Sequence, residues 1–81
     1  PLPEDTYYVR DLIGLDAVDE EGRSIGSISD VIINSAQDIY MIRPHDGKRE
    51  FPVPAVEEFI REINIEKGII VVRLIEGLQE L

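Results

Sequence analysis

Residues 38–53 read DIYMIRPHDGKREFPV and contain the clearest structural signal in the sequence. Two runs rich in β-branched and aromatic residues, 38–43 and 49–53, flank a turn at 44–48 that contains an Asp-Gly pair. Such a pair is typical of a tight hairpin turn, because glycine adopts the positive φ that the turn requires. The stretch therefore predicts a β-hairpin.

The second strand of this hairpin contains Pro52 and Pro54. Proline has no backbone N–H to donate to a sheet ladder, so a strand ends there or lies at a sheet edge. We expect the ladder to end near Val53. Residues 39–42 and 69–72 are apolar at every position. Strands of this kind are covered on both faces, and we expect a helix to cover one and a missing domain or a partner the other.

Two more hairpins are predicted around turns that contain glycine. They join residues 15–19 to 24–33 across the turn 20–23, and residues 63–65 to 69–75 across the turn 66–68. Residues 7–15 are rich in β-branched and aromatic residues, and we interpret them as a lead-in segment to the first strand. With the hairpin at 38–53, the predicted strands number six.

Between the second and third hairpins the spacing of apolar residues changes to that of a helix. They stand at positions 56, 59, 60 and 63, the i, i+3, i+4, i+7 pattern of a helix face. Pro54 suits the first turn of a helix, the acids at 57 and 58 suit its N-terminal end, and Arg61 suits its C-terminal end. We therefore predict a helical lid of about nine residues. Six short strands and one short helix indicate a mainly β fold, a small barrel without exposed edges.

The chain has 81 residues, of which 43% are hydrophobic, and it contains no cysteine. This length suits one small domain stabilised by packing, and the absence of thiols fits a cytosolic protein. The longest apolar runs are far shorter than the roughly 20 residues of a membrane span, and no signal-like segment opens the chain. A formal net charge of −9 opposes binding to nucleic-acid phosphates and favours basic partners, and it also suits solubility alone.

No arrangement of reactive residues indicates catalysis, a cofactor or a metal ion. The single histidine, His45, stands in a turn with one carboxylate beside it, which is too few donors for a metal site. No serine, Ser24 included, has a base placed next to it. The acids at 19–21 lack the alternating ligands of a calcium loop. Gly22 and Gly26 suit turn and bulge geometry better than a phosphate-binding loop. A binding or scaffold role follows by elimination.

Several separated motifs resemble one family. They are YY at 7–8, DLIGL at 11–15, glycines at 22 and 26, AQD at 36–38, Pro52 and EGL at 76–78. In order and spacing they resemble the C-terminal half of the RimM ribosome maturation factors, from residue 7 to the end of the chain. That half is a PRC-type barrel, a fold also seen in a photosynthetic reaction-centre subunit. Ser35, Asn64 and Ile75 depart from the family's usual glycine, aspartate and proline, so the family pattern does not define the turns there.

The resemblance implies a mainly β, six-stranded PRC-type β-barrel over residues 7–81. Residues 1–6 would be the remnant of an interdomain linker, after an N-terminal domain that this chain lacks. It also implies a domain that assists 16S rRNA processing and maturation of the small (30S) ribosomal subunit. The partner implied is small-subunit ribosomal protein nineteen, a basic protein of the subunit head, which agrees with the charge argument. We expect a cytoplasmic monomer without enzyme activity, cofactor, metal or membrane contact, and with little direct RNA binding.

In this family the tyrosine pair at the entrance of the domain is linked to association with the small subunit. Tyr7 and Tyr8 are therefore the partner-binding residues that the resemblance implies. Tyrosine suits this role because it offers a large rigid contact and a hydroxyl group. The alternative is that both rings pack onto the barrel or the missing domain. The rival function is a regulatory PRC-type barrel that packs against a membrane-associated or electron-transfer assembly, and the tyrosine pair with residues 11–15 favours the ribosomal one.

Overall fold

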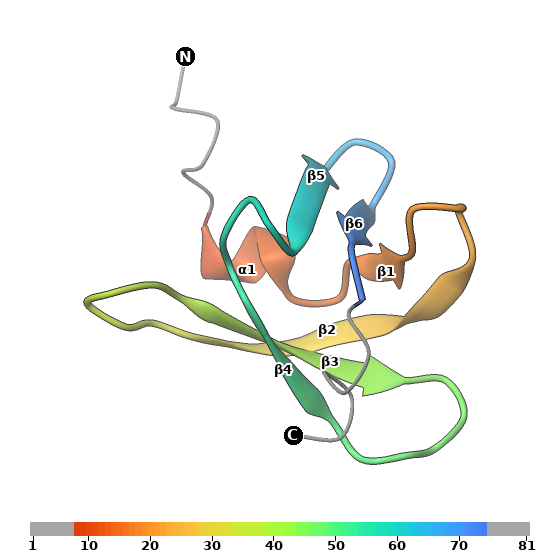
Figure 1. Ribbon diagram of the computed structural model, residues 1–81, viewed down its shortest axis with the longest axis horizontal. Coiled ribbons are helices and arrows are strands. Elements are labelled where there is room, and N and C mark those ends of the chain that lie inside the picture. Colours follow the sequence, from red (N-terminus) through yellow and green to blue (C-terminus); the bar gives the residue numbers. More distant parts are fainter. Residues whose placement is uncertain (1–7, 75–81) are drawn as a thin grey trace.

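The computed structural model describes residues 8–74, which form one curled sheet and one short helix (Figure 1). The elements in chain order are α1 (Val9–Leu12), β1 (Asp16–Val18), β2 (Ser24–Ile32), β3 (Ile39–Pro44), β4 (Phe51–Pro54), β5 (Ile60–Asn64) and β6 (Ile69–Val72). The strand order is β4-β3-β2-β1-β6-β5, and neighbours are antiparallel except for β1 and β6. The predicted mainly β fold with six strands and one short helix is confirmed, as a sheet curled into half of a barrel. The expected absence of exposed edges is wrong, because the described sheet does not close and ends at β4 and β5. Within residues 8–74 no helix is long and apolar enough to cross a membrane.

Glycines with positive φ form the turns of all three predicted hairpins. Gly22, Gly47 and Gly68 have φ values of 89°, 81° and 71°, a conformation that residues with a Cβ rarely adopt. At the second turn the Asp46 carboxylate also accepts the Lys48 N–H at 3.0 Å, which stabilises the loop. The three hairpins are therefore confirmed, although several strands begin or end a few residues away from the predicted bounds.

The helical lid predicted after β4 does not form. Residues 55–59 are bends and turns, in which the Val56 carbonyl accepts the Phe59 N–H at 3.0 Å and the Ile60 N–H at 2.8 Å, a single helix-like turn. The chain then enters β5, whose pairing with β6 shifts register between Ile60 and Glu62. Such a β-bulge adds a residue to the strand, so Ile60 and Ile63 both pack against the core although they are three positions apart. A bulged strand can thus show the same spacing of apolar residues as a helix face, which explains the wrong prediction.

The single helix lies instead in the predicted lead-in segment, at α1. The Ile13 N–H donates to the Val9 carbonyl at 3.0 Å, and Gly14, with a φ of 94°, follows the helix. The Gly14 N–H donates to the Ile28 carbonyl at 2.8 Å, which fastens α1 to β2. Leu12 is 3% exposed and belongs to the core. Burial of this one side chain outweighs the low helix propensity of the β-branched residues around it.

The hydrophobic core lies inside the curl of the sheet. Tyr40 of β3 pairs with Val31 of β2 and Val53 of β4, so these three residues share the inward face of the sheet. The core consists of Leu12, Leu15, Ala17, Ile28, Val31, Tyr40, Ile42, Phe51, Val53, Ile70 and Val72. Each large aliphatic or aromatic member stabilises the fold by roughly 1.5–3 kcal/mol relative to an exposed side chain. One shared core therefore joins both ends of the sheet.

The first edge of the sheet is β4, which contains Pro52 and Pro54. The predicted edge position is confirmed, and the ladder with β3 ends at Pro54, one residue beyond Val53, as predicted. The Ala55 N–H donates to the Asp38 carbonyl at 2.8 Å. Because bonding residues alternate in an antiparallel ladder, the two proline positions are the ones that face away from β3. Proline is tolerated there, since no ladder bond needs its missing N–H.

Candidate functional site

Tyr8 stands directly before α1 and is one of the two tyrosines predicted to bind a partner. It is 59% exposed, and the Arg10 guanidinium carbon lies 5.0 Å from the centroid of its ring. This cation–π contact orders the ring at the surface. Tyr7, the other predicted residue, lies outside the described part of the chain. Exposure is what a docking residue requires, and the role of both tyrosines stays a prediction.

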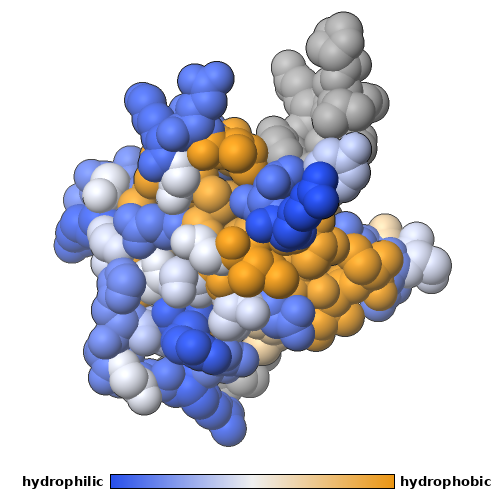
Figure 2. All heavy atoms as spheres, turned by 180° about the vertical axis from the view of Figure 1, so that it is seen from behind, coloured by the Kyte–Doolittle hydropathy of each residue, from blue (hydrophilic) through white to orange (hydrophobic). Residues whose placement is uncertain are grey.

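Other large apolar residues are exposed as well, two of them close to Tyr8 in the sequence. Val9 and Ile13 of the α1 region are 36% and 43% exposed, and Ile32 and Ile33 at the end of β2 are 46% and 67% exposed. Figure 2 shows hydrophobic residues gathered over the face of the molecule opposite to that of Figure 1. Exposed apolar area of this kind marks contact sites in soluble proteins. We call Tyr8, Val9 and Ile13 the entrance surface.

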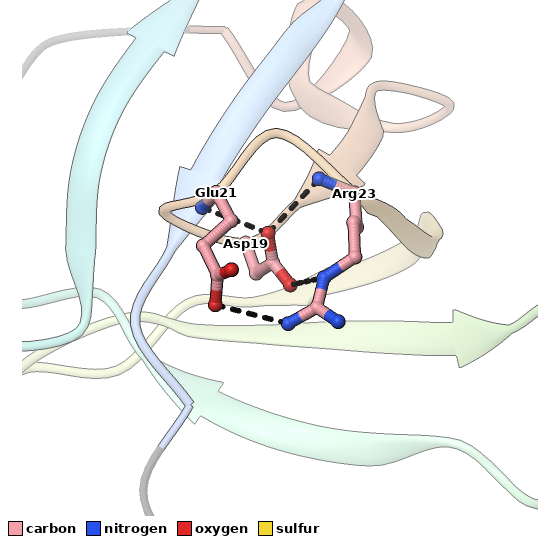
Figure 3. A network of polar contacts seen from close by, with 3 residues as sticks. All are labelled: Asp19, Glu21 and Arg23. Carbon is pink, nitrogen blue, oxygen red and sulfur yellow. Dashed lines mark hydrogen bonds and ion pairs between the residues drawn. The ribbon is translucent and has the colours of Figure 1, made fainter.

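The acidic turn between β1 and β2 is held together by its own arginine (Figure 3). Asp19 accepts the backbone N–H groups of Glu21 and Arg23, both at 2.9 Å, and the Arg23 side-chain Nε at 3.0 Å. Glu21 accepts a further bond from Arg23 at 3.0 Å. The bond from the Arg23 backbone, with that from Glu21 and the Arg23 charge, lowers the pKa of Asp19 against the opposing effect of burial. The acids at 19–21 thus build a turn, and residues 8–74 contain no cluster of three or more metal-binding side chains.

Glu20, the remaining acid of this turn, faces two arginines. Its carboxylate lies 3.8 Å from Nε of Arg61 and 3.9 Å from Nε of Arg73. Exposed pairs of this type are each worth at most about 1 kcal/mol. Their consequence here is electrostatic: every acid of the turn has a cationic neighbour, so this turn adds little unbalanced negative charge to the surface.

The structure brings together a serine, a histidine and an aspartate, although the sequence places no base beside Ser24. The Ser24 Oγ lies 2.6 Å from Asp16 Oδ1 and 2.7 Å from His45 Nε2. The hydroxyl has one proton, and donating it to the carboxylate leaves His45 Nε2 to act as a donor toward Oγ. A histidine that donates to a serine cannot also remove its proton. The arrangement therefore differs from a catalytic triad, in which the carboxylate orients the histidine.

A groove of about 880 Å³ lies between β5 and the turn that joins β2 to β3. Its lining is apolar at Ala36, Tyr40, Ala55, Val56, Ile60 and Ile63, and polar at Asn34, Gln37, Asp38, Glu57, Arg61 and Glu62. We call it the β5 groove. Sequence reasoning misses this groove, because it places a helix where β5 lies. The β-branched isoleucines at 60, 63 and 65 were the available signal for a strand.

The acids of the β5 groove are not neutralised in the way that the β1–β2 turn is. Asp38, Glu57 and Glu62 have no cationic partner within residues 8–74. Arg61, the one base of the lining, donates to the Glu57 carbonyl at 2.9 Å and also lies beside Glu20. The groove therefore combines an apolar floor with a negatively charged rim.

Comparison with known proteins identifies relatives of the chain. Residues 9–78 match the family model described as the RimM PRC barrel domain. The chain is 40% identical over 77 residues to the ribosome maturation factor RimM of Caldicellulosiruptor bescii and 43% identical over 79 residues to that of Alkaliphilus oremlandii. These alignments cover 95% and 98% of the chain but 46% and 47% of the relatives. The chain thus spans about half the length of the curated relatives it matches.

A solved structure has the same architecture. The crystal structure of a 16S ribosomal RNA processing protein, RimM, from Pseudomonas aeruginosa matches with a TM-score of 0.76 and 26% sequence identity. The match covers 91% of this chain and 46% of that chain. The curled six-stranded sheet is therefore shared with a solved member of the group to which the sequence relatives belong.

Proposed function

The chain belongs to the RimM PRC barrel domain family, and from this membership we propose that it is the protein-binding domain of a ribosome maturation factor. The factor would assist 16S rRNA processing and maturation of the small (30S) subunit. The family match over residues 9–78 carries the proposal. The chain spans about half the length of its relatives. We therefore also propose that residues 1–6 are the remnant of a linker to an N-terminal domain.

The partner in this proposal is small-subunit ribosomal protein nineteen, a basic protein of the subunit head. The chain has a formal net charge of −9, and acids without a cationic partner among the described residues line the β5 groove. A negative surface accelerates association with a basic protein and repels phosphate backbones. We therefore expect little direct RNA binding by this domain, which would act in the cytoplasm as a monomer.

The entrance surface supplies the apolar part of the proposed contact. Tyr8 is more than half exposed, and Val9 and Ile13 extend the apolar area beside it. Exposed tyrosines are frequent anchors of protein interfaces, because a rigid ring excludes water at little entropic cost. Tyr7 and Tyr8 are proposed as these anchors, and the acidic groove as the charged part of the recognition surface.

A binding role requires no catalytic group. Among residues 8–74, the cluster that most resembles a hydrolase site, at Asp16, Ser24 and His45, differs from a catalytic triad because the aspartate accepts a hydrogen bond from the serine. The proposal therefore assigns no reaction and no cofactor to this domain.

Calorimetry of the chain with purified protein nineteen at about 0.05 M and about 0.3 M salt tests the proposal. We expect binding that weakens at the higher salt, and a Kd about tenfold or more higher for Tyr7→Ala/Tyr8→Ala, because truncated anchor residues cost 2 kcal/mol or more. Tyr8→Phe is the control, since it keeps the ring and should bind almost as the original chain does. If the chain is folded, as shown by a cooperative unfolding transition, but does not bind at either salt concentration, the partner assignment is wrong.

A further inference from the structure

β5 is an edge of the sheet that remains open to pairing. It pairs with β6 on one side, and no other described strand lies on its second side. An edge strand presents free N–H and C=O groups at the spacing that another strand requires. β5 contains no proline, so each of its residues keeps an N–H, in contrast to β4 with Pro52 and Pro54. The N–H of Ile60, the first residue of β5, is already bonded to the Val56 carbonyl.

The β5 groove follows this open edge. Four consecutive residues of β5, 60–63, line it. Ile60 and Ile63 pack against the core whereas Arg61 and Glu62 are exposed, so a hollow that reaches all four follows the backbone edge. Residues 34 and 36–38 of the β2–β3 turn form the facing wall. The space beside the free edge of β5 is thus a channel with two walls.

The lining of this channel determines which kind of segment fits it. Partly buried aliphatic side chains form its floor, whereas Asp38, Glu57 and Glu62 on its rim have no cationic partner among the described residues. An added strand would direct alternate side chains to opposite sides. A segment that alternates aliphatic and basic residues satisfies both floor and rim, and an acidic or phosphate-bearing chain is repelled.

We propose that β5 accepts an extended segment of a basic protein as an additional β-strand seated in the β5 groove. This inference rests on the proposed function for the basic nature of the partner, and it adds how that partner is held. Main-chain hydrogen bonds to β5 supply affinity, and the floor and rim supply selectivity. The five residues of β5 span about 16 Å and match a segment of about five residues.

The test titrates the whole 81-residue chain, labelled with ¹⁵N, with a capped peptide of about seven residues that alternates lysine and valine. The peptide is expected to shift the amide signals of β5 and of residues 34–38 and 55–57, and to slow hydrogen exchange in β5. Two further peptides carry N-methyl groups, each on one of the two alternate sets of backbone nitrogens. One of these is expected to bind about tenfold more weakly, because it loses the donors that face β5, while the other binds nearly as the parent does.

A pair of matched variants tests the rim. Glu57→Gln/Glu62→Gln removes two charges that line the groove, and Glu58→Gln/Glu66→Gln makes the same change at exposed acids outside its lining. We expect the first variant to bind the peptide about fivefold more weakly at low salt and the second less than about twofold. All four positions tolerate an isosteric amide, so both variants stay folded.

Three results overturn this inference. The first is equal binding of the parent and both N-methylated peptides, and the second is signal shifts on other surfaces alone. The third is self-association of the chain through β5 without peptide, because the occupant of the groove is then a second copy of the chain.

Competition with protein nineteen separates the two proposals. If protein nineteen binds the chain and the peptide neither displaces it nor contacts β5, the proposed function stands and the strand addition fails. If the peptide occupies β5 and protein nineteen does not bind, the strand addition stands and the partner assignment fails.

Discussion

The two edges of the sheet end two different halves of the molecule. β4 ends a long antiparallel arm, in which six of the nine residues of β2 pair with the six of β3. β5 ends a half made of short strands, in which β1 and β6 are parallel and β5 is bulged. The arm has prolines on its free side, whereas the short half keeps all its N–H groups.

An edge of this sheet can therefore be protected in two ways. Proline at β4 removes the donors that another strand would use. At β5 the donors remain, and the neighbouring acids Glu57 and Glu62 repel a second copy of the chain while they attract a basic segment. Negative charge thus protects β5 against a second copy of the acidic chain, and the open edge stays available to a basic segment.

The largest expected effect comes from a substitution at the closest approach between β2 and β3. A Cβ at Gly26 would overlap the Arg43 carbonyl oxygen and lie 2.9 Å from the Pro44 Cα. Because these are backbone atoms, β2 and β3 would have to separate, and Gly26→Ala is expected to lower the free energy of unfolding by about 3 kcal/mol. Urea denaturation measures the loss. A loss below about 1 kcal/mol would show that the arm is more adaptable than its geometry indicates.

Gly47→Ala separates steric overlap from backbone strain. Its Cβ would meet nothing within 4 Å, but its φ of 81° disfavours a side chain. We expect a loss of about 1 kcal/mol in the same urea experiment, well below that of Gly26→Ala. Equal losses for the two glycines would contradict the account of the close approach between β2 and β3.

Removing the prolines of β4 should make the two edges alike. Pro52→Thr/Pro54→Thr restores two outward N–H groups, each worth about 1 kcal/mol when bonded, so self-association is expected to tighten about tenfold or more. Sedimentation equilibrium measures it. Pro52→Lys/Pro54→Lys restores the same groups with added charge and is expected to associate less than the threonine variant. Unchanged association of the threonine variant would mean that proline does not protect this edge.

The smallest expected effect concerns the β1–β2 turn. The pKa of Asp19 is lowered in the folded chain, so its contribution to stability is present above the unfolded pKa of about 3.9 and is lost as the pH falls through the folded value. Asp19→Asn is therefore expected to be less stable than the original chain at pH 7, with the gap closing at strongly acidic pH. Urea denaturation at both pH values measures the gap. A gap that persists below both pKa values would assign the loss to the shape of the side chain and not to its charge.

Much of the fold is predictable from local turn chemistry. Gly22, Gly47 and Gly68 mark all three hairpins, and the prolines indicate an edge strand. The sequence predicts a helix after β4, where none forms, and none before β1, where α1 forms, because tertiary contacts decide both places. A bulge at β5 gives Ile60 and Ile63 a helical spacing, and burial of Leu12 stabilises a short helix in a segment rich in β-branched and aromatic residues.

The candidate site is less predictable than the fold. The exposure of Tyr8 is consistent with the predicted docking role and does not test it. The groove joins residues 34–40 to residues 55–63, segments that periodicity cannot place side by side. Likewise, Ser24 meets His45 only because the β2–β3 ladder brings Gly26 beside Pro44. Long-range strand register, which a single sequence does not reveal, creates both arrangements.

Hydrogen–deuterium exchange of the chain, alone and saturated with protein nineteen, tests the contrast between the edges most directly. We expect slower exchange at residues 60–64 and 34–38 in the complex, with exchange in β4 unchanged. Protection of β4, or binding that leaves β5 exchanging as in the free chain, would contradict this expectation.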